Sequence, residues 1–357
     1  MSNSFQSFSI EAVTPIALNG NDSSVFTVTT AAANLWTSSG SDDWLGRPVL
    51  ADDGTRWIAA YRSAASHYNE GGGKVHVRFS TDEGATWTNE DTWTDGSAVT
   101  GAPFGPHAAD SNDNVGGAVI VVAPNGDILL FTGETGTTGG AYKYRSTDGG
   151  ATWADEGQLY PTTNIKPDDA FVYGGKIYIS SLEANDQNGG WPVNCALYVS
   201  SDDGTTFTKL SDLPTNTYGN EFSTVTLDGT NFIAVKREGD GVGTWISRSA
   251  DGGVTWSDWA IIDEGMYVVQ KPVLRSLAGG IMMVGRQGRM GVDTLYTVVW
   301  YSPDSVRWGR KFFPDTTGFN DAAYCSVLER SDGKFYILTY GGSTSAAVIR
   351  GGVFEIV

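Results

Sequence analysis

With 357 residues, 40% of them hydrophobic, the chain is long enough for two average domains or for one large all-β domain. Its formal net charge of −18 and its pI near 4.4 argue against nucleic acid and against insertion into anionic membranes, because like charges repel. No apolar run approaches the length of a transmembrane helix. The two cysteines, Cys195 and Cys325, support neither a disulfide scaffold nor a cysteine-based metal site.

The N-terminal segment, residues 1–44, carries no recognisable targeting signal. Its opening, MSNSFQSFSIEAVTP, lacks the basic stretch followed by an apolar stretch that is typical of a secretory signal. The sequence therefore leaves the compartment open. The stretch SSVFTVTT within this segment is expected to supply a β-strand.

Turn signals recur along the rest of the chain. Asn-Gly, Asp-Gly or Gly-Gly pairs, each followed by an apolar strand-like run, occur six times and predict β-hairpins. The second residue of each turn is a glycine: Gly54, Gly126, Gly175, Gly229, Gly280 and Gly333. The total of 46 glycines suits many short strands joined by tight turns, and no stretch has the period of a helix.

A second repeat, Ser-x-Asp-x-Gly-x-Thr-Trp/Phe, follows strand-like runs. Its copies span residues 80–87, 146–153, 200–207 and 249–256, with a decayed copy at 302–308. In such a turn the aspartate accepts backbone N–H bonds, the glycine adopts a positive φ and the aromatic residue packs into the sheet. These aspartates are therefore expected to be structural rather than catalytic.

Together the two repeats predict an all-β, six-bladed β-propeller that forms a single domain over residues 1–357. Six hairpins with five boxes correspond to six blades, the last of which lacks its box. The last blade, ending in GGVFEIV, is expected to pair with the strand of the N-terminal segment and so close the ring. Closure protects the open edges of a radial array.

The boxes resemble the Asp boxes, or BNR repeats, of the sialidase (neuraminidase) superfamily, although lectins and lyases with propeller folds carry them too. The resemblance spans roughly residues 45 to 345. In this family the site consists of three arginines, a tyrosine paired with a glutamate, and an aspartic acid. The useful question is which residues between the boxes match that set.

The first matches lie in two blocks. Arg47, followed directly by Pro48, stands where the family has its first arginine, before the first hairpin. Glu221 and Arg237 lie 16 residues apart with a single turn between them. Both side chains can thus face one pocket, and the family assigns them to the base that activates tyrosine and to the second arginine.

The block AYCSVLERSDGKFYILTY resembles the family's nucleophile block, which makes Tyr324 the candidate nucleophile. Tyr324 and Glu221 precede their turn glycines by nine and eight residues, so they are expected at the same face of the ring. For the third arginine the sequence offers Arg289 and Arg286, of which Arg289 fits the family spacing better.

The general acid departs from the family pattern. The segment SAASHYNEGGG has no aspartate, and His67 and Glu70 are its candidate acids. A later segment, GAPFGPHAADSND, offers His107 and Asp110 as alternatives. Trp191, in the loop EANDQNGGWPVN, is a candidate for stacking on a sugar or for anchoring the loop.

The resemblance implies a retaining glycoside hydrolase that binds the carboxylate of sialic acid, or of a related acidic sugar, through arginines. Its partner is then a sialylated or acidic glycan; no cofactor and no metal site are expected, since the histidines lack metal-ligand spacing. Two alternatives stay open: a polysaccharide lyase or other propeller enzyme acting on acidic glycans, and a non-catalytic, lectin-like propeller. An endo-acting variant is also open, and the substrate class suggests a secreted or virion-associated protein.

Overall fold

The computed structural model describes most of the chain after its N-terminal segment. The described residues are 26–37, 44–67, 74–88, 114–135, 140–162, 165–184, 193–217, 219–238, 243–262, 267–277, 279–289, 295–306, 308–312, 321–343 and 345–356. They form twenty-four β-strands and no helix. Accordingly, the described part of the chain holds no helix that is long and apolar enough to cross a membrane.

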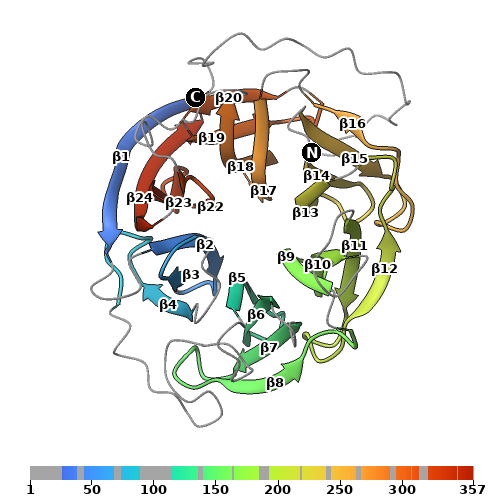
Figure 1. Cartoon of the computed structure of the whole chain (residues 1–357), viewed down its shortest axis with the longest axis horizontal. Helices are drawn as coiled ribbons and strands as arrows, with labels where there is room; N and C mark the ends of the chain where they lie inside the picture. The colour runs from blue at the N-terminus through green and yellow to red at the C-terminus, as the bar shows by residue number, and fades with distance from the viewer. Residues whose placement is uncertain are drawn as a thin grey trace.

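Four separate antiparallel sheets of four strands each stand around a central axis (Figure 1). One comprises β5 (Asn114–Val122), β6 (Ile128–Thr135), β7 (Ala141–Ser146) and β8 (Ala154–Gln158). The next comprises β9 (Ile165–Tyr173), β10 (Lys176–Ala184), β11 (Val193–Ser200) and β12 (Thr208–Asp212). Then come β13 (Gly219–Thr226), β14 (Phe232–Glu238), β15 (Thr244–Ser249) and β16 (Ala260–Ile261). The fourth comprises β17 (Tyr267–Leu277), β18 (Gly280–Arg289), β19 (Leu295–Ser302) and β20 (Gly309–Phe312).

The remaining eight strands form one sheet that joins the two ends of the described chain. They are β1 (Phe26–Trp36), β2 (Trp44–Asp52), β3 (Trp57–Ala64), β4 (Lys74–Ser80), β21 (Asp321–Ala322), β22 (Ser326–Glu329), β23 (Phe335–Ser343) and β24 (Ala346–Ile356). β1 runs antiparallel to β24 along the outside of the ring (Figure 1). The two halves of the sheet meet through a single parallel pair, Trp44 with Ala347.

The all-β propeller predicted from the sequence is confirmed. The innermost strands β2, β5, β9, β13, β17 and β22 all line one central cavity of about 420 Å³. The core lies between neighbouring sheets: Ile58 and Val77 of one sheet, for example, belong to the same buried cluster as Ile120 and Leu130 of the next. By hydrogen bonding the described strands form five sheets, so the expected count of six separate blades stays a prediction.

The Asp boxes form compact turns. In the copy at 200–207, Ser200 Oγ donates to Asp202 Oδ1 (2.7 Å) and accepts the N–H of Gly204 (2.9 Å). The Asp202 carboxylate accepts the backbone N–H of Thr206 (2.9 Å) and its hydroxyl (2.7 Å). The carboxylate thus accepts three hydrogen bonds inside its own turn, in keeping with the structural role expected from the sequence.

Each box also contributes to a joint between neighbouring sheets. Gly150 takes φ +89° and lies so close to Phe79 of the preceding sheet that a Cβ there would come within 2.2 Å of the ring. Arginines also donate to the backbone carbonyl at the fourth position of the next box around the ring, either in the next sheet or, in the last pair, in the other half of the eight-stranded sheet. These pairs are Arg56 with Gly149 (2.9 Å), Arg145 with Asp203 (3.0 Å), Arg248 with Ser305 (2.5 Å) and, closing the ring, Arg330 with Glu83 (3.0 Å).

The hydrogen bonds in these turns predict that the folded protein loses stability in acid. Hydrogen bonds from Thr206 and Ser200 lower the pKa of Asp202 from 3.8 to about 2, and those from Thr255 and Ser249 do the same for Asp251. The unfolded chain then binds more protons between these values, so the stabilisation is complete above about pH 4 and is lost as the pH falls towards 2.

We expect the free energy of unfolding, measured with urea at several pH values, to decrease over this range. Asp202→Asn should be less stable at pH 7 and less sensitive to acid than the wild type, whereas Asp212→Asn, at an exposed position outside the boxes, should follow the wild type. An equal acid sensitivity of Asp202→Asn and wild type would contradict this interpretation.

Candidate active site

The innermost strands share an irregularity at one level of the ring. The pairing register shifts at residues 46–49 of β2, 115–118 of β5, 220–222 of β13 and 270–273 of β17. In the eight-stranded sheet, the segment that pairs with β23 is interrupted between β21 and β22. Four residues at this level have left-handed backbones: Arg47 (φ 54°), Glu221 (φ 55°), Lys271 (φ 48°) and Ala323 (φ 77°). Bulges re-aim side chains, and positive φ at residues other than glycine is a strained state that clusters at functional sites.

The bulges bring a phenol and a carboxylate together. Tyr324 Oη donates a hydrogen bond to Glu221 Oε1 at 2.6 Å across 103 residues of sequence. Glu221 lies in β13 and Tyr324 directly before β22. The Tyr324 side chain is buried, with 3% of its surface exposed. The two residues expected at the same face of the ring are thus in direct contact.

Guanidinium groups surround this pair. Arg286 donates from Nη2 to Tyr324 Oη (3.0 Å), and its Cζ lies 4.3 Å from the centre of the Tyr324 ring. Arg237 donates from Nη1 to Glu221 Oε2 (3.0 Å). Arg47 Cζ lies 5.9 Å from the same tyrosine ring. Three arginines from three different sheets therefore converge on the Tyr324–Glu221 pair.

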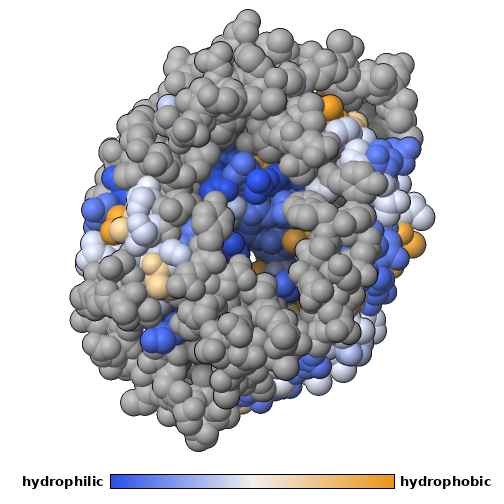
Figure 2. Space-filling model, in the orientation of Figure 1, coloured by the Kyte–Doolittle hydropathy of each residue, from blue (hydrophilic) through white to orange (hydrophobic). Residues whose placement is uncertain are grey.

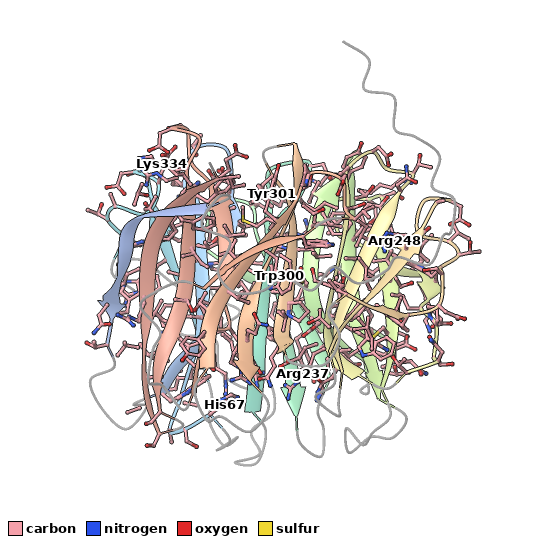
Figure 3. All side chains as sticks on the ribbon, turned by 90° about the horizontal axis from the view of Figure 1, so that it is seen from above. His67, Arg237, Arg248, Trp300, Tyr301 and Lys334 are labelled. Carbon is pink, nitrogen blue, oxygen red and sulfur yellow. The ribbon has the colours of Figure 1, made fainter. Side chains whose placement is uncertain are left out.

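The cluster lies at one end of the central axis. Figure 3 shows Arg237 and His67 at the same end of the molecule, opposite the turn that holds Lys334. Seen along the axis, the centre of the ring is hollowed and its visible walls are strongly hydrophilic (Figure 2). A polar ligand entering this hollow meets mostly hydrophilic side chains.

The charges set the protonation of the pair. Burial raises the pKa of Glu221, but Arg237, Arg286, the hydrogen bond from Tyr324 and Lys271 outweigh it and lower this pKa to about 2. Burial and the negative charge of Glu221 raise the pKa of Tyr324 above its usual value, against the opposing effect of the arginines. At neutral pH Glu221 is therefore ionised and Tyr324 holds its proton.

Two further residues of the cluster were not predicted from the sequence. Lys271 donates its backbone N–H to Glu221 Oε2 (2.9 Å), and its ammonium forms an ion pair with Asp168. A signal for both was present: they precede their turn glycines by nine and seven residues, within the same narrow range as Tyr324, Glu221 and Arg47. Counting back from the turn glycine, as for Tyr324 and Glu221, can therefore be applied to every hairpin.

The acid candidates are only partly described. His67 is buried, with its ring 6.3 Å from that of Tyr324 and 5.0 Å from that of Trp44. Its backbone carbonyl accepts a hydrogen bond from Arg62 (3.4 Å). His67 thus lies beside the candidate nucleophile. Glu70, His107, Asp110 and the loop residue Trp191 lie outside the described residues.

Of the two candidates for the third arginine, Arg286, which fits the family spacing less well, lies within the described part of the cluster. Arg286 contacts Tyr324, as given above. Arg289 ends β18 and pairs through its backbone with Tyr267, and its side chain lies outside the described part of the structure. A role for Arg289 stays a prediction. Among the described residues, no group of three or more His, Cys, Asp or Glu residues is arranged to hold a metal ion.

Comparison with known proteins supports the fold. A family model described as a BNR repeat-like domain matches residues 54–168. A protein of unknown function from Dyadobacter fermentans superimposes with a TM-score of 0.74 and 16% identity, over 93% of this chain and 99% of its own. A search of curated protein sequences gives no match.

Solved sialidases are also similar in fold. Trypanosoma rangeli sialidase, in complex with 2,3-difluorosialic acid as a covalent intermediate, gives a TM-score of 0.67 and 18% identity over 96% of this chain. The Hadza microbial sialidase Hz136 gives 0.63 and 14% over 88%. The match covers 58% of the first and 65% of the second, so the chain spans less than two thirds of either sialidase. At these identities the likeness establishes a sialidase-like propeller fold.

The charge balance of the cluster predicts the effect of removing its central anion. In Glu221→Gln, the neighbouring cations Arg237, Arg286 and Lys271 lose their shared counter-charge. We expect the free energy of unfolding at pH 7 to fall by about 3 kcal/mol, against about 2 kcal/mol for Tyr324→Phe, which removes the charge-assisted hydrogen bonds of one hydroxyl but leaves every charge in place. Urea unfolding of both variants measures this difference, and a Glu221→Gln variant as stable as the wild type would contradict the proposed charge balance.

Proposed function

We propose that the protein is a retaining glycoside hydrolase that cleaves sialic acid, or a related acidic sugar, from glycans, with Tyr324 as nucleophile. The observation that supports this most strongly is the Tyr324–Glu221 hydrogen bond enclosed by three guanidinium groups. Each residue alone has ordinary structural explanations. Their contact at one end of a propeller axis is the combination that this chemistry requires.

The arginines fit an anionic substrate. A guanidinium keeps its charge at any working pH and has five N–H donors in a fork that matches a carboxylate. The single hydrogen bond from Arg237 to Glu221 uses only part of this capacity. Sialic acid carries its carboxylate on the anomeric carbon, so binding it here holds the reacting carbon near Tyr324 and orients it for attack.

A phenol suits this substrate better than a carboxylate nucleophile. An ionised carboxylate would be repelled by the substrate's own carboxylate, whereas a protonated tyrosine is neutral. Sialidases with a tyrosine nucleophile are a known exception to the two-carboxylate pattern of glycosidases. Glu221 takes the role of the base because it already accepts the phenolic hydrogen.

The pKa values constrain the timing of proton transfer. Glu221 has a pKa of about 2 and the pKa of Tyr324 is raised, so a free phenolate is scarcely populated before the substrate binds. The proton is therefore expected to move to Glu221 as the Tyr324 oxygen bonds to the anomeric carbon. The glycosidic bond breaks in the same step, and the leaving oxygen takes a proton from an acid, for which His67 and Glu70 are the candidates. Water then attacks the anomeric carbon of the glycosyl-tyrosine and gives one proton to the residue that protonated the leaving group. The bond to the Tyr324 oxygen breaks in this step, and Glu221 returns its proton to that oxygen.

We further propose that the domain comprises six blades, with the eight-stranded sheet counted as two. The two halves of this sheet are linked by one residue pair, and each half supplies one strand to the central cavity, β2 or β22. In this interpretation β1 is the outer strand of the last blade, which makes residues 1–357 one closed propeller.

Hydrolysis of a fluorogenic aryl sialoside tests the proposal. An aryl leaving group departs without a general acid, so the assay depends on the nucleophile rather than on the unassigned acid. We expect Tyr324→Phe to lower kcat on the order of 1,000-fold or more. Tyr160→Phe is a matched control, because it removes another buried phenol, whose hydroxyl bonds to Ser181 (2.5 Å) rather than to Tyr324, Glu221 or the arginines.

The other outcomes separate the alternatives. Release of an unsaturated product absorbing in the near ultraviolet from an acidic polysaccharide would indicate a lyase. Binding of sialylated glycan without turnover would indicate a lectin-like protein. Full activity of Tyr324→Phe on the aryl sialoside would contradict the assigned nucleophile.

A further inference from the structure

An ion pair next to the Tyr324–Glu221 contact links two sheets across a third. The ammonium of Lys271 in β17 binds the carboxylate of Asp168 in β9, and it also donates to the Asp168 carbonyl (2.5 Å). β13, which carries Glu221, lies between them around the ring (Figure 1). Both side chains are largely buried, with 17% and 11% of their surfaces exposed. Isolated charges at such positions are costly, so each depends on the other.

Each partner also binds the strand of Glu221 directly. Lys271 donates its backbone N–H to Glu221 Oε2 (2.9 Å). Asp168 Oδ2 accepts the backbone N–H of Phe222 (2.6 Å), the residue that follows Glu221. Glu221 is thereby held at its carboxylate from one side and at its backbone from the other. The left-handed conformations of Glu221 and Lys271 are the strained states that these bonds stabilise.

We propose that Asp168 and Lys271 act as one positioning unit, which fixes the orientation of the Glu221 carboxylate towards Tyr324 and keeps it ionised for catalysis. This inference rests on the proposed function and extends it by two residues. Neither residue is placed against the substrate or the reacting atoms. Their effect passes through Glu221.

The charges around Glu221 indicate what Lys271 contributes. Arg237 from β14, Arg286 from β18 and Lys271 from β17 favour the ionised carboxylate, and the hydroxyl of Tyr324 donates to it. The negative charge of Asp168 in β9 opposes the effect of these cations on Glu221, and the ammonium of Lys271 neutralises that charge. The charge of Arg47 from β2 acts on Tyr324, whose ring centre lies 5.9 Å from its Cζ.

Without the ammonium of Lys271, the carboxylate of Asp168 would lie beside that of Glu221 with no cation to neutralise it. Burial already raises the pKa of Asp168, and the loss of Lys271 would raise it further. The pKa of Glu221 would rise for the same reason.

Lys271→Met tests the unit while keeping the backbone N–H that binds Glu221. We expect kcat on the aryl sialoside to fall roughly 10- to 100-fold with KM changed by less than about threefold, because the base is misaligned while the arginines still bind the substrate. The acidic limb of the pH profile of kcat/KM should move to higher pH. Lys271→Arg, which restores the cation, should recover most of the rate and return the acidic limb towards its original position.

The chain offers a matched control in the same two strands. Arg275, four residues after Lys271 in β17, binds Asp169 in β9 through two hydrogen bonds (2.9 and 3.1 Å) and makes none to Glu221 or Tyr324. Arg275→Met should lower the unfolding temperature, as Lys271→Met does, but leave the acidic limb of the pH profile unmoved. If both variants move the acidic limb equally, the effect is a general loss of stability and the inference is wrong.

A double variant tests whether the pair works as a unit. If it does, Asp168→Asn combined with Lys271→Met should be no slower than Lys271→Met alone by more than about threefold. Multiplying losses would mean that the two residues act independently, which overturns the proposal. Should Lys271→Met fail to fold, Asp168→Asn alone must reduce kcat without moving the acidic limb upward, since it leaves the lysine's charge in place.

The experiments distinguish a failure of this inference from a failure of the proposed function. Wild-type protein that does not turn over the aryl sialoside contradicts the function itself. Wild-type turnover together with an unchanged rate and pH profile for Lys271→Met contradicts only the positioning unit.

Discussion

The hydrogen bond between Tyr324 and Glu221 is the contact on which the chemistry proposed for this propeller depends. It joins a phenol, normally a weak nucleophile, to a carboxylate that the surrounding cations keep ionised. Because the acceptor is charged, the bond is of the strong, charge-assisted kind. The arginines around it would stabilise an anionic substrate and the ionised base at the same time.

The scaffold explains how residues far apart in the sequence reach one place. Asp-box turns use their own polar groups internally, and arginines from neighbouring sheets bind the carbonyls of these turns. The sheets are thereby fixed relative to one another at the rim. At the axis, bulges in the innermost strands turn Arg47, Glu221 and Lys271 into unusual backbone conformations that point their side chains to a common region. The fixed sheets and the strained bulges thus together bring the residues of the site into contact.

The sequence was informative wherever the determinant is local. Box and turn motifs specify their hydrogen bonds within a few residues, which is why the all-β propeller could be predicted. Glu221 and Arg237 could be paired because a single turn separates them. Tyr324 could be added because its distance from its turn glycine matches that of Glu221.

Longer-range features were not accessible in the same way. The distances of Lys271 and Asp168 from their turn glycines place both at the level of Glu221, but these distances do not show that two residues 103 positions apart form an ion pair. Arg286 and Arg289 lie three residues apart, and spacing alone does not specify which side chain reaches Tyr324. That choice depends on the register of β18 against β17, which only the folded sheet defines.

The most direct test of the central claim is covalent trapping. Incubation of the protein with 2,3-difluorosialic acid, followed by peptide mass spectrometry, reports which side chain attacks the anomeric carbon. The account predicts one fluorosialyl adduct on the peptide that contains Tyr324, absent from Tyr324→Phe. An adduct on another residue, or none in a protein that hydrolyses sialosides, would contradict it.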